Sequence, residues 1–373
     1  MGLRLVSVQG TPAECGAAYG AAAREEIQAN LEAYQRRFAD QAGLDQAAVR
    51  RGGERFRAAT MTHWPRIAAM LDGVAEGSGV APAEIYALNA RTELLYGTAR
   101  EAAAGECTAI GVLGTHTDTG HLLLGQNWDW HPDQRDAMLL LRTTDERGHT
   151  ILTLAEAGMV AKTGLNSAGV GLCLTMLATG WDGLTDPPGV PYHVLARATL
   201  EAECLALATR AACISPRNAS INLLLGQAGD PAFGDPAVGG ELIDLELVPD
   251  DVGLLHPVGG FLTHANHLES GLPVHDHQKN WGGSSLYRSA RARRLLAEPV
   301  EARKATIDDL ASVFRDHGAY PHGICRHLDD RLPPLERAET VCSIVLDLDA
   351  RRFGIAAGPP CAHQYEWLDV LDA

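Results

Sequence analysis

The stretch Gly105–Asp129, GECTAIGVLGTHTDTGHLLLGQNWD, carries a cysteine near its start and ends on an aspartate. Apolar and small residues alternate over 108–113, a polar and glycine-containing segment follows, and 122–124 resumes an apolar run. This pattern predicts two antiparallel strands joined by a turn. Antiparallel pairing would bring Cys107 and Asp129 to the same end of the hairpin.

Length and composition indicate a soluble globular protein. The chain has 373 residues, of which 46% are hydrophobic and 21% charged, enough for one large domain or two smaller ones. The formal net charge of −16 argues against a nucleic-acid partner, because phosphate binding needs a basic patch of comparable size. The nearest candidate, the arginine-rich stretch 287–294, is interpreted as the solvated face of a helix.

Targeting signals and cysteine usage favour the cytoplasm. The N-terminus lacks a charged leader followed by an apolar run, no segment reaches membrane-spanning length, and the myristoylation pattern is missing. Eight cysteines are scattered without a CxxC pair, which is typical of a reducing compartment and offers no zinc signature. We therefore expect a cytoplasmic protein with no membrane partner, no cofactor and no metal.

The predicted secondary structure changes from helical to β-rich near residue 105. Before it, residues 11–104 favour helices, with runs at 13–40, 44–63, 64–75 and 82–96. After it, short β-rich runs alternate with turns and helical segments. The expected strands after the hairpin are 137–143, 150–155, 169–174, 220–225, 241–247, 340–348 and 352–357, and the expected helices are 191–212, 287–296 and 307–315. The sequence thus predicts a helical segment 1–106 followed by a β-rich portion 107–373.

A cysteine at the head of a strand needs a base to become a nucleophile. A thiol is mostly protonated at physiological pH. If the bond between Glu106 and Cys107 were cut, Cys107 would gain a free α-amine with an ordinary pKa of about 7.7 to 8.0. Such an amine can accept the thiol proton near neutral pH, so Cys107 is a candidate nucleophile that carries its own base.

Several short segments, in their order along the chain, resemble one enzyme family. In the first part they are Cys107-Thr108, Gly125–Asp129 (GQNWD), Thr163–Gly169 (TGLNSAG) and Thr263–His267 (THANH). In the last part they are His322–His327 (HGICRH) and Gly358–Cys361 (GPPC). Over nearly its whole length the chain resembles the acyl-coenzyme A:6-aminopenicillanic acid acyltransferase family, also called the C45 peptidase family.

This resemblance implies a fold and a maturation step. The family has the N-terminal nucleophile hydrolase fold, an α+β architecture in which two stacked antiparallel sheets lie between helical layers (αββα). Its precursor cuts itself before the nucleophilic cysteine, and both fragments stay together. Here the cut would fall between Glu106 and Cys107, giving an α fragment 1–106 and a β fragment 107–373 within one αββα unit.

The resemblance also implies three catalytic roles. Cys107 matches the nucleophile, and its freed amine would be the base. Asp129 matches the aspartate that orients this amine and balances its charge, as the third member of a triad does. Asn266 matches the asparagine whose side-chain NH₂ stabilises the tetrahedral oxyanion.

Two positions depart from the fungal pattern of the family. Glu106 stands where that pattern has glycine, a residue that helps a strained peptide reach the geometry for attack. Ala109 replaces a threonine two residues after the nucleophile, and Thr108 is the candidate to supply the lost support. We expect Glu106 to affect the efficiency of self-cleavage and not the chemistry of Cys107.

The candidate residues also have structural explanations, and the histidines offer an alternative function. Taken alone, Asp129 is also explained as a strand end and Asn266 as a turn cap, and Cys325 and Cys361 are interpreted as packing residues. The rival is a metal-dependent hydrolase, for which the histidine-rich segments supply candidate ligands. These candidates are His264, His267, His275, Asp276, His277, His317, His322 and His327. A non-catalytic scaffold remains as a third interpretation if the bond before Cys107 stays uncut.

The sequence favours hydrolysis of a linear amide in a small N-acyl compound or peptide, through a thioester. Coenzyme A-dependent acyl transfer by the same nucleophile is the alternative, because the two reactions differ only in the acceptor of the second step. Hydrolysis is preferred since no basic cluster for the coenzyme A phosphates is evident. Trp130, Trp181 and Trp281 are candidates for the pocket wall or for the core, and homo-oligomerisation is left open.

Overall fold

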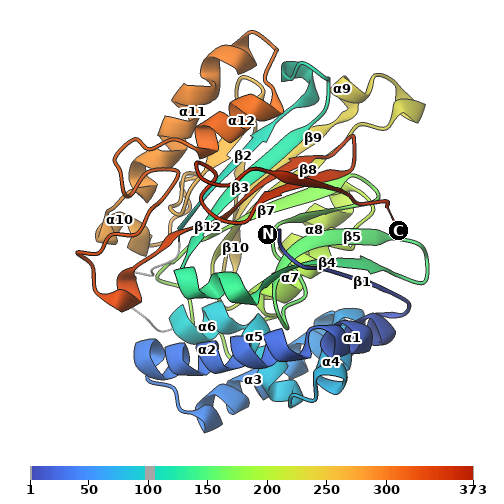
Figure 1. Cartoon of the computed structure of the whole chain (residues 1–373), viewed down its shortest axis with the longest axis vertical. Helices are drawn as coiled ribbons and strands as arrows, with labels where there is room; N and C mark the ends of the chain where they lie inside the picture. The colour runs from blue at the N-terminus through green and yellow to red at the C-terminus, as the bar shows by residue number, and fades with distance from the viewer. Residues whose placement is uncertain (1, 97–105, 373) are drawn as a thin grey trace.

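The computed structural model describes residues 2–96 and 106–372, and its N-terminal region forms a layer of helices (Figure 1). The run expected over 13–40 is two helices, because the backbone leaves the helical region at the buried Ala23 (φ −109°, ψ 27°). Residues 97–104, the end of the region expected to be helical, lie outside the described residues. The helices are α1 (Pro12–Ala22), α2 (Arg24–Ala42), α3 (Gln46–His63), α4 (Pro65–Ser78), α5 (Pro82–Asn89) and α6 (Arg91–Tyr96).

The first of two sheets has eight strands in the order β1-β4-β5-β6-β7-β8-β9-β10. Its strands are antiparallel except for β1 and β4, which pair in parallel. They are β1 (Leu5–Gln9), β4 (Met138–Thr144), β5 (Thr150–Glu156), β6 (Gly164–Asn166), β7 (Val170–Met176), β8 (Ile221–Gln227), β9 (Glu241–Val248) and β10 (Asp251–Leu255). Through β1, the N-terminal segment contributes a strand as well as helices.

The second sheet has six antiparallel strands in the order β11-β2-β3-β12-β13-β14. They are β2 (Glu106–Val112), β3 (Leu123–Trp130), β11 (Phe261–His264), β12 (Glu339–Asp347), β13 (Arg352–Ala356) and β14 (Glu366–Asp369). β2 and β3 form the predicted hairpin, with Glu106 opposite Asp129 and Cys107 opposite Trp128. The expectation that Cys107 and Asp129 lie at the same end of the hairpin is therefore confirmed.

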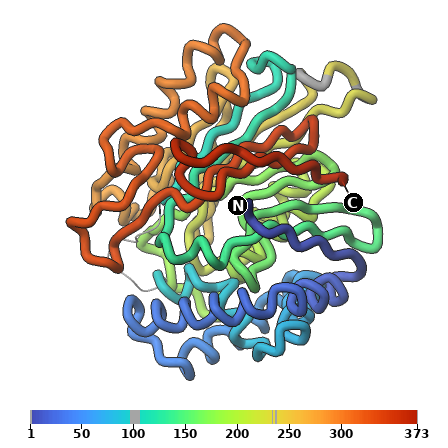
Figure 2. Tube along the Cα trace, viewed as in Figure 1, coloured from blue at the N-terminus to red at the C-terminus, as the bar shows by residue number. Residues whose placement is uncertain are grey.

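Helices cover the outer faces of both sheets. Two helices share an apolar cluster with the N-terminal helices, namely α7 (Tyr192–Leu200) and α8 (Leu205–Ile214). Two others pack on the six-stranded sheet, namely α11 (Ser285–Glu301) and α12 (Ile307–Phe314). The tube in Figure 2 shows the blue N-terminal helices and the orange α11 and α12 on opposite sides of the strands. The remaining short helices are η1 (Gly114–His116), η2 (Pro132–Ala137), η3 (Pro231–Phe233), α9 (Pro236–Gly239), α10 (His277–Trp281) and η4 (Pro334–Glu336).

Adjacent layers pack against each other through three apolar clusters. One lies between the N-terminal helices and the eight-stranded sheet, one between the two sheets, and one between the six-stranded sheet and α11 with α12. The order is helix, sheet, sheet, helix, which confirms the expected αββα fold class. Within residues 2–96 and 106–372, no helix is both long and apolar enough to cross a bilayer.

Candidate active site

Cys107 lies in the core between the two sheets. Opposed residues of an antiparallel pair share a face, so the Cys107 thiol and the Trp128 ring both point into this core. The thiol lines a cavity of about 20 Å³, which has room for about one water. Lys162 lines the same cavity, with Nζ 3.2 Å from the centroid of the Trp128 ring and 2.5 Å from Oε1 of Glu156.

The thiol is protonated in this environment. Burial raises the pKa of Cys107 to about 11, and the charge of Asp129 adds to the rise, while Lys162 and Arg288 oppose it. Burial also lowers the pKa of Lys162 to about 8, against the attraction of Glu156. Cys107 therefore needs a base before it can act as a nucleophile.

The backbone nitrogen of Cys107 contacts Asn266, just after the end of β11. The Cys107 N–H donates to Oδ1 of Asn266 at 2.7 Å, and Nδ2 of Asn266 donates to the carbonyl of Met176 at 2.9 Å. An N–H can only donate and a carbonyl can only accept, so these two partners define the orientation of the Asn266 amide. One hydrogen of its NH₂ group remains for a further acceptor.

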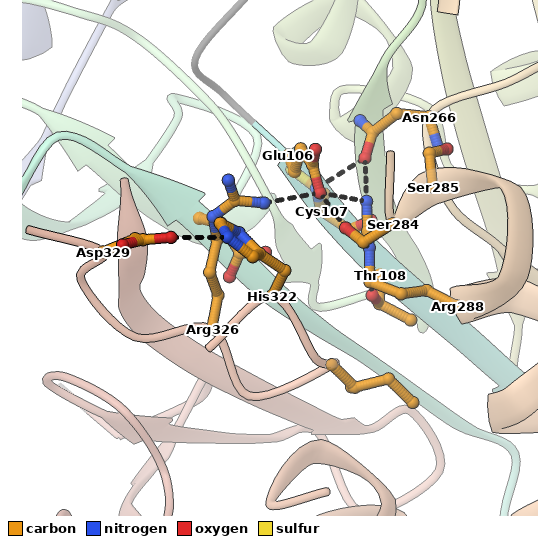
Figure 3. A network of polar contacts seen from close by, with 12 residues as sticks. Glu106, Cys107, Thr108, Asn266, Ser284, Ser285, Arg288, His322, Arg326 and Asp329 are labelled. Atoms are coloured by element: carbon orange, nitrogen blue, oxygen red, sulfur yellow. Dashed lines mark hydrogen bonds and ion pairs between the residues drawn. The ribbon is translucent and has the colours of Figure 1, made fainter. Parts of the chain in front are cut away.

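Arg288 of α11 is the centre of the polar network in Figure 3, and it is completely buried. Nη1 donates to the Cys107 carbonyl and to Oγ1 of Thr108 (2.7 Å). Nη2 donates to Oδ1 of Asn266 (2.9 Å). Nε donates to Oγ of Ser284 (3.0 Å). The Arg288 guanidinium thus connects Cys107 and Thr108 at the start of β2 to Asn266.

Glu106 is held by three donors through Oε2. These are Oγ of Ser284 at 2.5 Å, Nη2 of Arg288 at 2.9 Å and Nη1 of Arg326 at 2.8 Å. Burial alone would raise the pKa of Glu106, but the charges of Arg288 and Arg326 outweigh it and bring the pKa to about 2. The residue that stands where the fungal pattern has glycine is therefore a partly buried, ionised carboxylate paired with two arginines.

Asp129 lies on the opposite face of the sheet from the thiol, because its register partner is Glu106. Its Oδ1 accepts a hydrogen bond from Oγ1 of Thr340 at 2.7 Å, and Oδ2 is buried without a partner among the described residues. Burial raises the pKa of Asp129 to about 7, with Arg288 and Arg326 opposing the rise. The structure thus places Asp129 beside the network around Glu106, with one carboxylate oxygen still free to accept.

Sequence reasoning missed Arg288, Arg326 and Ser284. Arg288 lies within 287–294, and its complete burial corrects the interpretation of that whole stretch as a solvated face. A signal was present in the spacing, since Arg288 shares a helical face with small and aliphatic residues. The buried face of α11 consists of Ser285, Arg288, Ser289, Ala292, Leu296 and Val300.

A larger cavity of about 630 Å³ opens next to Glu106. Ser284, Arg326 and His322 supply polar groups to its wall, and Trp281 and Tyr287 supply rings. Of the tryptophans considered from the sequence, Trp281 thus lines this cavity, Trp130 lines the small one beside the thiol, and Trp181 packs on a minor apolar cluster.

The histidines expected for a metal hydrolase do not form one group. His264 is buried against Glu246 (2.9 Å), and His322 pairs with Asp329 (3.0 Å). His317 and His327 do meet, and they meet Cys325 and Cys361 there. Cys325 is buried, as a packing residue would be, whereas Cys361 is exposed and does not pack in a core.

The family model for acyl-coenzyme A:6-aminopenicillanic acid acyl-transferase matches residues 115–361. The chain belongs to this family. The 40 kDa form of acyl-coenzyme A:6-aminopenicillanic-acid-acyltransferase from Emericella nidulans is 29% identical over 360 residues, which are 95% of this chain and 92% of the relative. The resemblance seen in the sequence is confirmed, and the chain is a member of an enzyme family.

Two solved structures of other proteins match the chain weakly. Penicillin V acylase from Agrobacterium tumefaciens matches with a TM-score of 0.45 and 14% identity, over 70% of this chain and 86% of that one. A mutant of conjugated bile acid hydrolase from Clostridium perfringens matches with a TM-score of 0.45 and 10% identity, over 70% of this chain and 92% of that one. The N-terminal nucleophile hydrolase fold itself rests on the αββα layers and on membership in the acyltransferase family.

The raised pKa of Asp129 predicts a stability that depends on pH. Between its ordinary value of 3.8 and about 7 the folded carboxyl keeps a proton that the unfolded one has lost. Its cost to folding is therefore absent below about 3.8, grows as the pH rises to about 7, and stays constant above. In a Cys107→Ala background, Asp129→Asn should melt at a higher temperature than its parent at pH 8, and the gap should shrink at pH 5.

Glu106→Gln is the matched control for this experiment, because the pKa of Glu106 is shifted downward. An ionised Glu106 stabilises the fold above its ordinary pKa of 4.5, and this contribution is lost as the pH falls toward about 2. Glu106→Gln should therefore lower the melting temperature at pH 8 in the same background. An Asp129→Asn variant that behaves like Glu106→Gln would show that the Asp129 carboxylate is favourably paired in the precursor.

Proposed function

We propose that the chain is a self-processing cysteine amidohydrolase of the N-terminal nucleophile type, which cleaves the linear amide of a small N-acyl compound or peptide. One observation carries this proposal. The backbone N–H of Cys107, which a cut before Cys107 would turn into part of a free amine, lies 2.7 Å from Oδ1 of Asn266, while the thiol of the same residue faces the core between the sheets. Nucleophile, base and oxyanion donor would thus arise from two contacting residues.

In the proposed maturation, Sγ of Cys107 attacks the carbonyl carbon of Glu106. The C–N bond breaks, the leaving nitrogen takes up a proton and becomes the α-amine, and a thioester joins the two residues. Water then hydrolyses the thioester to a carboxylate on Glu106 and a free thiol on Cys107. Contacts on both sides support this step, since Glu106 is anchored through its side chain and Cys107 through its N–H.

In the proposed turnover, the freed amine accepts the thiol proton and the thiolate attacks the acyl carbon of the substrate. The second hydrogen on Nδ2 of Asn266 would donate to the oxyanion while the first stays on Met176. Asp129, with its unpartnered Oδ2, would accept from the new ammonium group and hold it in place. The amine product leaves, and a thioester to Cys107 remains.

The acceptor of the second step decides between hydrolysis and transfer. Water gives the acid and thus an amidohydrolase, whereas an amine gives a new amide and thus an acyltransferase, with coenzyme A thioesters as the alternative acyl donors. We retain hydrolysis as the first choice, because among residues 2–96 and 106–372 Arg326 is the one arginine that lines the large cavity, and coenzyme A carries several phosphate charges.

The cavity beside Glu106 is the proposed substrate site. Glu106 lines it, and Cys107 is the next residue in the chain, so a cut between them would allow the new chain end to move and expose the nucleophile. The rings and the polar groups in its lining suit an acyl amide with an apolar part and a polar part. A cytoplasmic location is part of the proposal, supported by eight cysteines that are all free thiols.

A screen of N-acyl amides and short N-acyl peptides, with and without an amine acceptor, tests the proposed function. Mass spectrometry should detect release of the acid at a rate that an added amine or coenzyme A leaves nearly unchanged. The Cys107→Ala variant is the matched control and should be inactive. New amide formed faster than acid would assign the chain as an acyltransferase, and turnover that survives Cys107→Ala would contradict the nucleophile.

A further inference from the structure

Four side chains from two segments of the chain meet near the surface. They are His317, Cys325, His327 and Cys361, and their nitrogen and sulfur atoms all lie within 4.8 Å of one another. Nε2 of His327 is 3.0 Å from Nε2 of His317. It is 3.6 Å from Sγ of Cys325 and 3.5 Å from Sγ of Cys361. Two imidazoles and two thiols thus converge on one point.

We propose that these four residues bind one Zn²⁺ ion in a closed structural site. Zinc takes nitrogen at about 2.0–2.1 Å and sulfur at about 2.3 Å in a tetrahedron, which puts neighbouring donor atoms about 3.3–3.8 Å apart. The three distances from His327 are close to this range. Two thiolates and two imidazoles are also the donor set that favours zinc over magnesium or calcium. No metal was expected from the sequence, because its cysteines form no CxxC pair.

The site would join two segments that carry little regular structure. The loop 315–338, which lies entirely within the described residues, connects α12 to β12 and contains η4 as its one helix. Cys361 belongs to the turn 357–365 between β13 and β14. Nε of Arg315 already donates to the carbonyl of Pro360 at 3.1 Å, so the two segments lie side by side without a metal. Zinc would fix a long loop that has few elements of its own to hold it.

This position gives the zinc a consequence for the active site. Cys325 and His327 flank Arg326, which binds Glu106 through Nη1 at 2.8 Å (Figure 3). The Arg326 N–H donates to Oγ1 of Thr340 at 2.9 Å. Metal binding on both sides of Arg326 would therefore hold this positioning residue against Glu106. With four protein ligands the site has no open position for substrate, which distinguishes it from a metal-dependent hydrolase.

Metal content of the full-length protein tests this site without any activity measurement. Protein purified with zinc present should hold about one zinc ion per chain. Exchange for Co²⁺ should produce the visible absorption and sulfur-to-metal charge-transfer bands of tetrahedral cobalt thiolate. Cys361→Ser and His317→Ala, both at exposed side chains, should lose the bound metal. Cys213→Ser and His256→Ala are matched exposed controls and should keep it.

A chelator provides a second readout. It should lower the melting temperature of the parent and of both controls, and leave Cys361→Ser and His317→Ala unchanged. Cys107→Ala should bind zinc like the parent, so this result stands apart from the proposed catalytic function. The site is refuted if the parent takes up neither zinc nor cobalt, if the two cluster variants bind like the controls, or if mass analysis finds a disulfide between Cys325 and Cys361 in protein purified without reductant.

Discussion

Purified protein should consist of two chains, residues 1–106 and 107–373, that elute together under native conditions and separate in denaturant. The expected cause is attack of the Cys107 thiol on the carbonyl of Glu106. The fragments should stay together because β1 pairs with β4 and the N-terminal helices share an apolar core with the eight-stranded sheet. Intact-mass analysis of freshly purified and incubated samples measures the extent of cleavage.

Cys107→Ala should abolish this cleavage completely and leave one chain of 373 residues. Cys213→Ser, an exposed cysteine outside the network, is the matched control and should be cleaved like the parent. Comparing the extent of cleavage in the parent and in Glu106→Gly measures how Glu106 affects self-cleavage. Glu106→Gly restores the residue of the fungal pattern and removes the ion pairs to Arg288 and Arg326. Parent protein that stays in one chain after prolonged incubation would end the self-processing proposal.

The second large effect is expected at Asn266, where two substitutions separate two functions. Asn266→Asp keeps an oxygen that can accept from Cys107 N–H and from Arg288, but an aspartate carboxylate cannot donate. Asn266→Ala loses both functions. If the NH₂ group stabilises the oxyanion, both variants should lose on the order of 10² to 10³ in kcat, with a smaller change in KM.

Alkylation and maturation provide the controls for Asn266. Iodoacetamide should alkylate Cys107 at a near-normal rate in Asn266→Asp, because that reaction creates no oxyanion. The extent of cleavage must be measured first, so that kinetics compare mature enzymes. If alkylation and turnover fell together, Asn266 would be positioning the nucleophile. If Asn266→Asp turned over normally, the oxygen would be the functional atom and the oxyanion role would be wrong.

Much of this site could be predicted from local pattern. Alternation over 108–113 and the apolar run 122–124 predicted the hairpin, and antiparallel pairing with period two then put Cys107 and Asp129 at one end. The short strands β1, β6, β10, β11 and β14 were missed, because three to five residues hold too few alternations to show a period. The fold class was nevertheless correct, since the long strands and the family motifs were sufficient.

The spacing places Arg288 on the face of its helix that carries small and aliphatic residues, but local pattern could not reveal the partners that allow its burial. Four arginines between 287 and 294 are the composition of a solvated helix, and nothing in the chain near Arg288 pairs with its charge. Its partners Glu106 and Cys107 belong to β2, which lies far earlier in the sequence than α11. Burial of a guanidinium is tolerated only where such acceptors surround it, and that is a property of the assembled fold.

The sequence by itself determined the hairpin, the order of the family motifs and the αββα layers, and it supplied Cys107 as the candidate nucleophile, because each depends on residues close together in the chain or on a resemblance carried by short motifs. Only the tertiary structure decided which face of the sheet each side chain occupies, which arginines hold Glu106, and that His317, Cys325, His327 and Cys361 meet. These contacts join segments that are separated by long stretches of chain. They form when apolar burial packs the layers together, and no local periodicity records that packing.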